Sequence, residues 1–267
     1  MVHTLITGGS SGIGLKIAQL LVQRGENVSL LARNNAKLED AKRLLLRESH
    51  GSHVRTIPVD VTDFQAMKDA VASCVKAQGA IDNLISSAGM IIPQSFLLQT
   101  HEDFDIQIKT NLIGVANSIR AIYPDMIAAR RGKIMIISSG AALLGIPGFG
   151  AYCASKYGLR GLATSLRIEA RPKGVSISIC FPPDTDTPQF RTEIAQRNEE
   201  TNIFLGPPKP WQVDKVANRI LKGMDAREDE IFFGFGMTLL NHFGAFIRPA
   251  IEKAYERRNR KKSHISR

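Results

Sequence analysis

The stretch Thr7–Gly14, with the sequence TGGSSGIG, follows the short apolar run His3–Thr7 and leads into an amphipathic run over Ile13–Arg24. Its glycines let the backbone turn sharply and approach a ligand, and the amino end of the following helix favours a negatively charged pyrophosphate. Such a loop between a predicted strand and a predicted helix is typical of a dinucleotide-binding turn. The residues expected to contact the dinucleotide here are Gly8, Ser10, Ser11, Gly12, Ile13 and Gly14.

Short apolar runs alternate with longer helical patterns along the first 180 residues. The predicted strands are His3–Thr7, Val28–Ala32, Val54–Val59, Leu84–Ser86, Ile134–Ser138 and Val175–Phe181. The predicted helices are Ile13–Arg24, Ala36–Glu48, Phe64–Gln78, Asp103–Ala129 and Tyr152–Ala170. Continuous apolar strands separated by helices imply a parallel sheet that is covered on both faces. We therefore expect an α/β protein with a Rossmann-like, doubly wound parallel sheet.

The pattern changes after Phe181, where two prolines interrupt the apolar run. A helical pattern returns at Gln212–Met224, and Glu230–Phe233 predicts a last strand. We expect one dinucleotide-binding domain over residues 1–230, followed by an extension over residues 231–267 that is first apolar and then basic.

The apolar part of this extension, Ile231–Ile251, contains five phenylalanines. Glycine, polar residues and Pro249 interrupt it, so it falls short of the ~20 mostly apolar residues that cross a membrane. A helix packed on the core, a substrate lid, a dimer face and a helix lying on a membrane surface all fit this segment.

The sequence carries 35 Lys and Arg against 25 Asp and Glu, a net charge of +10. Anionic membranes, polyanions and phosphorylated cofactors are partners that suit such a charge. Part of the excess lies in the last eleven residues, as Arg257, Arg258, Arg260, Lys261, Lys262 and Arg267. This tail is either solvated or in contact with a membrane surface. Nucleic acid is not an expected partner, because no nucleic-acid-binding motif accompanies the charge.

Cys74, Cys153 and Cys180 are too widely spaced for a metal site or a disulfide framework, and the six histidines form no ligand pair. We therefore expect no metal. The strand pattern begins at His3, which leaves no room for a signal peptide in this sequence. The expected location is the cytoplasm, either free or peripheral on the cytoplasmic face of a membrane.

The end of the second predicted strand selects between the two nicotinamide dinucleotides. An enzyme specific for NAD commonly places Asp or Glu there to bind the ribose hydroxyls, whereas this chain has Arg33, with Lys37 one turn further on. A guanidinium forms charge-assisted hydrogen bonds with a 2′-phosphate, which a carboxylate would repel. The sequence therefore predicts NADPH. Asp60 and Val61 follow the third strand, where the carboxylate either contacts the adenine or caps the next helix.

Tyr152 and Lys156 are four residues apart at the start of a predicted helix, so they share one face of it. A phenol ordinarily titrates near pH 10, and a neighbouring positive charge lowers its pKa. Lys156 and a cationic nicotinamide are together expected to act on Tyr152 in this way. Ser139, or its neighbour Ser138 if the strand register differs by one, can polarise a carbonyl oxygen by hydrogen bonding. Asn111, within the predicted helix Asp103–Ala129, is either a surface amide or part of a proton relay.

With these residues in view, the chain resembles the short-chain dehydrogenase/reductase family. The Gly8–Gly14 loop, Asp60, Ser86–Gly89, Asn111, Ser139, Tyr152 and Lys156 follow the family's order over residues 1–190. The resemblance implies hydride transfer between the nicotinamide and a carbonyl carbon. In it, Tyr152 delivers the proton, Ser139 orients the carbonyl, Lys156 binds the ribose and Asn111 holds a relay water. The chain departs from the family at Ser86-Ser87, where two asparagines are usual, and this leaves the local side-chain bonding open.

The segment Phe181–Phe190, the strand end at Arg33 and the helix around Tyr152 are similar to those of 3-ketodihydrosphingosine reductases. This resemblance implies NADPH-dependent reduction of a long-chain keto-sphingoid base, 3-ketosphinganine, to sphinganine. Asp184 and Asp186 either face the substrate's ammonium group or cap the turn. Family members commonly form homo-oligomers through the helices near Asn111 and Tyr152.

Two other functions remain open at this point. One is an NADPH-dependent reductase of 3-oxoacyl thioesters or other ketones, because the fold hosts many substrates. The other is a non-catalytic NADPH-binding sensor or scaffold, against which the complete set of Ser139, Tyr152 and Lys156 speaks.

Overall fold

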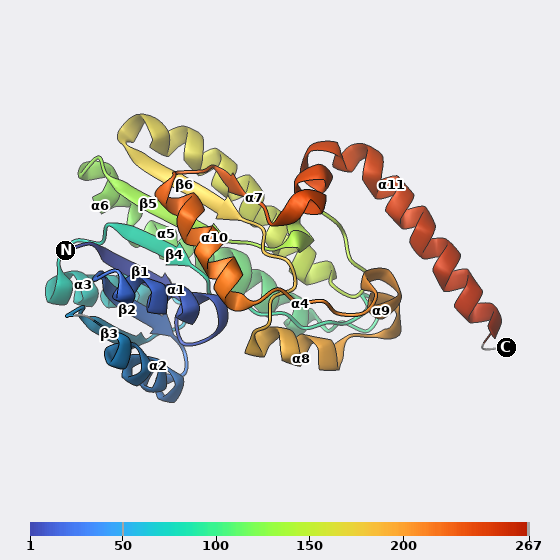
Figure 1. The fold of residues 1–267 in the computed structure, drawn as a ribbon, viewed down its shortest axis with the longest axis horizontal. Helices are drawn as coiled ribbons and strands as arrows, with labels where there is room; N and C mark the ends of the chain where they lie inside the picture. Colours follow the sequence, from blue (N-terminus) through green and yellow to red (C-terminus); the bar gives the residue numbers. More distant parts are fainter. Residues whose placement is uncertain (50, 266–267) are drawn as a thin grey trace.

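The computed structural model describes residues 1–49 and 51–265, with side chains described as far as Arg260. Seven parallel strands form one sheet in the order β3-β2-β1-β4-β5-β6-β7 (Figure 1). The strands are β1 (His3–Thr7), β2 (Asn27–Ala32), β3 (Val54–Pro58), β4 (Asn83–Ser86), β5 (Gly132–Ile137), β6 (Val175–Cys180) and β7 (Glu230–Ile231). The strand order reverses between β1 and β4, which are hydrogen-bonded neighbours, with Thr7 opposite Ser86. The prediction of a doubly wound parallel sheet is confirmed.

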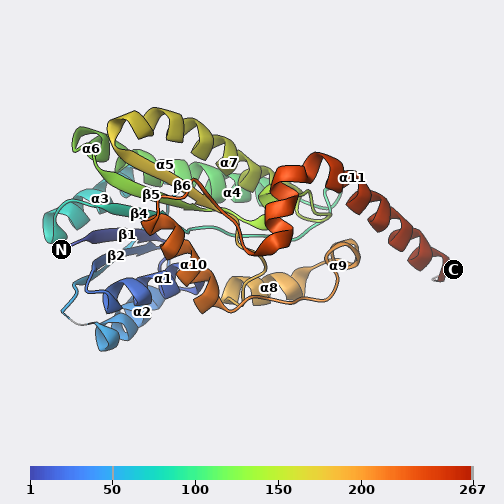
Figure 2. The ribbon, with the colours of Figure 1, turned by 45° about the horizontal axis from the view of Figure 1, so that its top comes forward.

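Helices cover both faces of the sheet (Figure 2). Those of the first five crossovers are α1 (Gly12–Gln23), α2 (Asn35–Glu48), α3 (Phe64–Gln78), α4 (His101–Ile108), α5 (Gly114–Arg120), α6 (Tyr123–Ala128) and α7 (Gly150–Ala170). Those that follow β6 are α8 (Pro188–Gln196), α9 (Glu199–Leu205), α10 (Val213–Asp225) and α11 (Gly234–Ile265). The expected helices thus lie within one or two residues of their predicted bounds, except in the region before β5.

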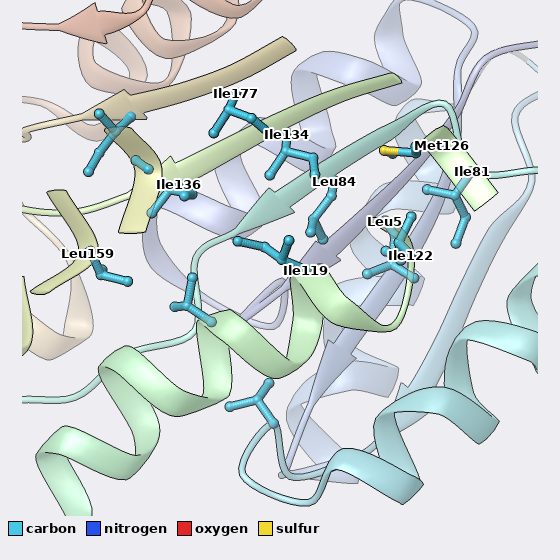
Figure 3. Packing of buried hydrophobic residues seen from close by; sticks show 14 of the residues in the cluster. Leu5, Ile81, Leu84, Ile119, Ile122, Met126, Ile134, Ile136, Leu159 and Ile177 are labelled. Atoms are coloured by element: carbon cyan, nitrogen blue, oxygen red, sulfur yellow. The ribbon is translucent and has the colours of Figure 1, made fainter. Parts of the chain in front are cut away.

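Two apolar cores lie on the two faces of the sheet. One buries strand residues such as Leu84 and Ile134 against α3, α5, α6 and α7 (Figure 3). The other buries residues such as Ile6 and Leu30 against α1, α2 and α10. Because the side chains of a strand alternate between faces, both neighbours in a pair such as Leu5 and Ile6 are buried. This explains why the strands read as continuous apolar runs.

The single helix predicted over Asp103–Ala129 is wrong. A π-helical turn, η1 (Lys109–Ile113), separates α4 from α5, and the chain then leaves helical geometry at Ile122 before α6 begins, with Pro124 in its first turn. Proline at that position fits only the first turn of a new helix. The polar stretch after β6 also contains two helices that the apolar periodicity did not reveal, α8 and α9. Their N-caps, Thr187 and Asn198, accept hydrogen bonds from Phe190 N and Thr201 N.

The C-terminal segment starts inside the core and leaves it. The expected boundary after residue 230 falls within β7, and Phe233 is buried. In α11, Phe243 has non-helical φ and ψ, and beyond this kink the helix extends away from the body (Figures 1 and 2). In the described part of the chain, no helix is both long and apolar enough to span a bilayer. Within the basic tail, the side chains of Lys261 and Lys262 and the whole of Arg267 lie outside the described residues.

Candidate active site

A cleft of about 540 Å³ opens at the carboxyl ends of the strands, where the order reverses between β1 and β4. Ligands of doubly wound folds bind at this position, because the loops diverge there to opposite faces of the sheet. The cleft gathers most of the residues predicted from the sequence. These are Gly8, Ser10, Ser11, Gly12, Ile13, Arg33, Lys37, Asp60, Val61, Ser138, Ser139, Tyr152 and Lys156. Gly14 and Asn111 lie behind its walls.

The glycine turn is built for close backbone approach. Gly8 has a φ of 68°, and a Cβ there would lie 2.8 Å from the backbone of Ser87 and Ala88. A Cβ on Gly14 would lie 2.5 Å from the carbonyl oxygen of Gly8, so this glycine lets α1 pack against the turn. At the start of α1, the N-cap Ser11 makes no side-chain capping bond. The first-turn N–H groups are therefore left to a ligand, and this arrangement fits a pyrophosphate.

The end of β2 presents positive charge to the same cleft. Arg33 and Lys37 are exposed and line it, and neither pairs with a carboxylate among the described residues. Asn34 holds the start of α2 by accepting a hydrogen bond from Lys37 N at 2.9 Å. This fixes the backbone that carries both cations.

Asp60 also lies in the cleft, but it does not cap the following helix. Its Oδ1 accepts hydrogen bonds from the N–H and the hydroxyl of Thr62, both at 2.9 Å. The cap of α3 is Asp63, which accepts from Ala66 N. The capping interpretation of Asp60 is therefore wrong, and its carboxylate faces a ligand site.

Tyr152 and Lys156 project from the first turns of α7 into the cleft. The Lys156 Nζ lies 5.5 Å from the centre of the Tyr152 ring and donates a hydrogen bond to the Ile137 carbonyl at 3.2 Å. The Phe149 ring packs edge-on against Tyr152. Lys156 is buried, and burial lowers its pKa to about 8.

The predicted lowering of the Tyr152 pKa by Lys156 and a cationic nicotinamide concerns the enzyme with its cofactor and stays a prediction. Burial raises the pKa of the Tyr152 phenol well above its usual value, and the hydrogen bond with Ser139 opposes this only partly. The negative charges of Glu193 and Asp184 raise it further. The phenol is therefore protonated at neutral pH, which is the form that donates a proton.

The structure separates the two adjacent serines. The Ser139 hydroxyl is hydrogen-bonded to Tyr152 and accepts from Ala141 N at 3.2 Å. Ser138 is buried and its hydroxyl donates to the Lys156 carbonyl at 3.2 Å, which ties the end of β5 to α7. Ser139 is thus the serine placed beside the phenol.

Asn111 is fully buried in η1, so the surface-amide interpretation is wrong. Its Oδ1 accepts from Met90 N at 2.8 Å, and its Nδ2 donates to Met90 O at 2.9 Å and Ser155 Oγ at 3.1 Å. The amide thereby joins the loop after β4 to α7, next to Lys156. π-Helical turns of this kind often occur at functional sites. At the unusual Ser86-Ser87 position, Ser86 Oγ is buried without a hydrogen-bond partner in the described structure.

Three segments that lie apart in the sequence complete the cleft beyond Tyr152, namely the loop before α7, α9 and α11. Its apolar wall consists of Leu144, Ile146, Phe149, Leu205, Met237 and Leu240. Met237 and Leu240 come from α11, which confirms that its first turns pack on the core and also cover the cleft. Asp184 and Glu193 line the cleft too, whereas Asp186 turns outward to Arg191, 3.0 Å away. Glu193 and the α11 residues were not singled out from the sequence, since no local pattern distinguishes them from ordinary helix positions.

Residues 2–198 match the family described as short chain dehydrogenase. The chain belongs to this family. It is therefore an oxidoreductase with a nicotinamide cofactor, which the glycine turn and the cleft beside it fit. Among solved structures, levodione reductase superposes with a TM-score of 0.80 at 23% identity, covering 88% of this chain and 96% of that one, and shows the same fold.

The sequence of this short-chain dehydrogenase is also similar to those of reductases named for one substrate. A 3-dehydrosphinganine reductase of Arabidopsis thaliana is 39% identical over 89% of this chain and 72% of its own. A 3-ketodihydrosphingosine reductase of Bacteroides thetaiotaomicron is 38% identical over 75% and 72%. An alcohol dehydrogenase of Thermococcus sibiricus, solved in complex with 5-hydroxy-NADP, is 25% identical with a TM-score of 0.75 and covers 87% of this chain and 96% of that one.

Proposed function

We propose that this oxidoreductase reduces the 3-keto group of 3-ketosphinganine to sphinganine with NADPH. The observation that best supports this proposal is the position of Tyr152 and Ser139, which lie in one cleft between the glycine turn and an apolar wall. A long-chain ketone needs such a wall for its alkyl chain and a proton donor at its carbonyl. The names of the relatives from Arabidopsis thaliana and Bacteroides thetaiotaomicron support the choice of ketone.

The preference for NADPH rests on the end of β2. Arg33 and Lys37 stand where a carboxylate would bind the ribose of NADH, and neither has an acidic partner in the described structure. A 2′-phosphate would give both cations a partner through charge-assisted hydrogen bonds. The relative solved with an NADP derivative supports this choice.

The residues around Tyr152 divide the chemistry among them. When bound, the reduced nicotinamide supplies a hydride to the carbonyl carbon. Ser139 donates a hydrogen bond to the carbonyl oxygen, which increases the electrophilic character of the carbon. The protonated phenol of Tyr152 transfers its proton to the developing alkoxide. Lys156, held by the Ile137 carbonyl, keeps a positive charge beside the ring and stabilises the phenolate that remains.

A direct assay tests the proposal. Purified protein mixed with NADPH and 3-ketosphinganine should oxidise the NADPH and form sphinganine, and NADH should support a much lower kcat/KM. Turnover of a 3-oxoacyl thioester without turnover of 3-ketosphinganine would overturn the proposed substrate. It would favour a reductase of 3-oxoacyl thioesters or other ketones. Tight NADPH binding without turnover of any ketone would favour a sensor.

We further propose that α11 contacts the anionic cytoplasmic face of a membrane. Phe235 and Phe246 are about 80% exposed and Phe243 is half exposed, while basic residues follow on the same helix. Exposed aromatic rings next to lysine and arginine suit an interfacial helix. The full chain should float with vesicles containing phosphatidylserine, and replacing the three phenylalanines with serine should abolish flotation. Equal flotation of both proteins would refute the contact.

A homo-oligomer through the helices near Asn111 and Tyr152 is likewise a proposal. Ile113 in η1 and Ile168 in α7 are large apolar side chains that are exposed there. Sedimentation equilibrium should give at least twice the mass of 29.3 kDa, and a monomer at micromolar concentration would contradict it.

A further inference from the structure

An acidic cluster lies on the cleft wall opposite the cationic end of β2. The buried guanidinium of Arg197, on α8, donates to Glu193 Oε1 from Nε at 3.0 Å and from Nη2 at 2.6 Å. Its Nη2 also donates to Asp184 Oδ2 at 3.0 Å, in the loop after β6. The Arg197 guanidinium stacks over the Phe190 ring, which fixes the plane of the guanidinium. Both carboxylates line the cleft together with Tyr152.

The charges of this cluster do not balance. Two carboxylates share one guanidinium, which leaves one negative charge. Within the described structure, the second oxygens, Glu193 Oε2 and Asp184 Oδ1, have no hydrogen-bond partner. Burial disfavours the charged form of Glu193 despite Arg197, so its pKa is raised. If Arg197 served only to hold α8 against the loop after β6, a single carboxylate would be enough to pair with it. Glu193 is largely buried, whereas the Asp184 side chain is 39% exposed, so the surplus negative charge lies at the surface of the cleft, where a cation can reach it.

We propose that Glu193 and Asp184 bind the ammonium group of an amino ketone, in which the amino-bearing carbon is bonded to the carbonyl carbon. The cluster is close enough to Tyr152 for its charge to act on the phenol, and the carbonyl oxygen must lie at that phenol. An ammonium one carbon away therefore falls on the acidic side of the cleft. The class of ketone rests on the proposed function, and 3-ketosphinganine is such an amino ketone. Asp186, by contrast, is occupied by Arg191 and does not line the cleft.

This assignment explains how the site would choose among ketones. A 3-oxoacyl thioester has no ammonium group and would leave the surplus carboxylate unpaired. An ammonium group would supply up to three N–H donors to the two free oxygens. The apolar wall would accept either alkyl chain, so the acidic cluster distinguishes the two classes where the wall does not.

The test compares two substrates that differ only in the amino group, namely 3-ketosphinganine and 1-hydroxyoctadecan-3-one. Glu193→Gln keeps the size of the side chain and an oxygen for Arg197. It should lower the ratio of kcat/KM for the amino ketone to that for the plain ketone by about 10- to 100-fold. Asp186→Asn, two residues before the start of α8, is the matched control and should change this ratio less than twofold. Equal losses on both substrates would mean that Glu193 only braces α8, and would overturn the proposal.

A binding measurement separates this proposal from the proposed function. Calorimetry of the protein with NADP⁺ should show sphinganine binding at least tenfold more tightly than octadecane-1,3-diol, and Glu193→Gln should remove most of that difference. Should Glu193→Gln not fold, Asp184→Asn replaces it, because it leaves the Glu193–Arg197 pair intact. If the wild type reduces 3-ketosphinganine but binds the two alcohols equally, the function stands and the ammonium site is wrong. If it reduces no ketone yet shows the binding difference, the ammonium site stands and the function is wrong.

Discussion

The two ends of the cleft are built in different ways. The cofactor end uses backbone from consecutive segments, the turn between β1 and α1 and the end of β2. The substrate end uses side chains from the loop before α7 and from α8, α9 and α11, which are separated by up to about 100 residues of chain. A pyrophosphate is the same in every member of a nicotinamide enzyme family, so close backbone packing can hold it. A substrate varies, and side chains on added helices can vary with it.

The largest expected effect on activity is at Tyr152, where the cofactor end and the substrate end of the cleft meet. Tyr152→Phe removes the proton donor and leaves both ends in place, so kcat should fall by about 10²- to 10⁴-fold. Fluorescence titration should show NADPH binding within a few-fold of the wild type. Turnover within tenfold of the wild type would refute the role of the phenol.

Lys156, also at this junction, gives a prediction on stability. Its pKa in the folded protein, about 8, is below its usual value near 10.5, so the folded state binds fewer protons between these values. Stability from this group therefore rises with pH from about 8 to 10.5, and its penalty is present in full below pH 8. Lys156→Met removes the penalty. Relative to the variant, the wild type should gain up to roughly 3 kcal/mol in unfolding free energy over that range. Urea unfolding at pH 7 and pH 10 measures the gain, and a constant difference would contradict it.

Arg33→Asp tests the cofactor end alone. It replaces a cation with a carboxylate that repels a 2′-phosphate, so Kd for NADPH should rise by about 10- to 100-fold while that for NADH changes little. Arg47→Asp, exposed on α2 outside the cleft, is the control. An equal loss of affinity for NADPH and NADH would show that Arg33 does not contact the 2′-phosphate.

Gly14→Ala tests whether the cofactor end depends on backbone packing. Its Cβ would meet the Gly8 carbonyl at 2.5 Å, whereas nothing lies within 4 Å of a Cβ on Gly161 in α7. Gly14→Ala should cost about 1–3 kcal/mol and lower Tm by several degrees. Gly161→Ala should raise Tm slightly, because alanine favours helix. Calorimetry distinguishes the two, and an unchanged Tm for Gly14→Ala would show that the turn tolerates a side chain.

The smallest effect is expected at the substrate end. Leu240→Ala shortens the apolar wall and should raise KM for a long-chain ketone by about fivefold, since roughly 1 kcal/mol of burial is lost. KM for a short ketone should not change. Leu239→Ala, on the same helix but outside the cleft, is the control. A similar rise in KM for both ketones would show that α11 does not contact the alkyl chain.

Sequence patterns were reliable where one segment carries its own signal. The glycine turn and the apolar strands are local, because turn geometry and burial on both faces each depend on neighbouring residues. They failed where distant segments compete. The π-helical turn η1 contains Asn111, whose hydrogen bonds reach Met90 and Ser155 in other segments, and the apolar pattern continues across it.

The sequence by itself determined the doubly wound sheet, the cofactor turn and the order of Ser139, Tyr152 and Lys156. Only the tertiary structure decided which serine lies beside the phenol, that burial raises the pKa of Tyr152, and that Glu193 stands beside Asp184 with a single arginine between them. The physical reason is the same in each case. Desolvation and charge pairing depend on which side chains meet in space, and residues 184, 193 and 197 meet only because α8 folds back over the carboxyl ends of the strands.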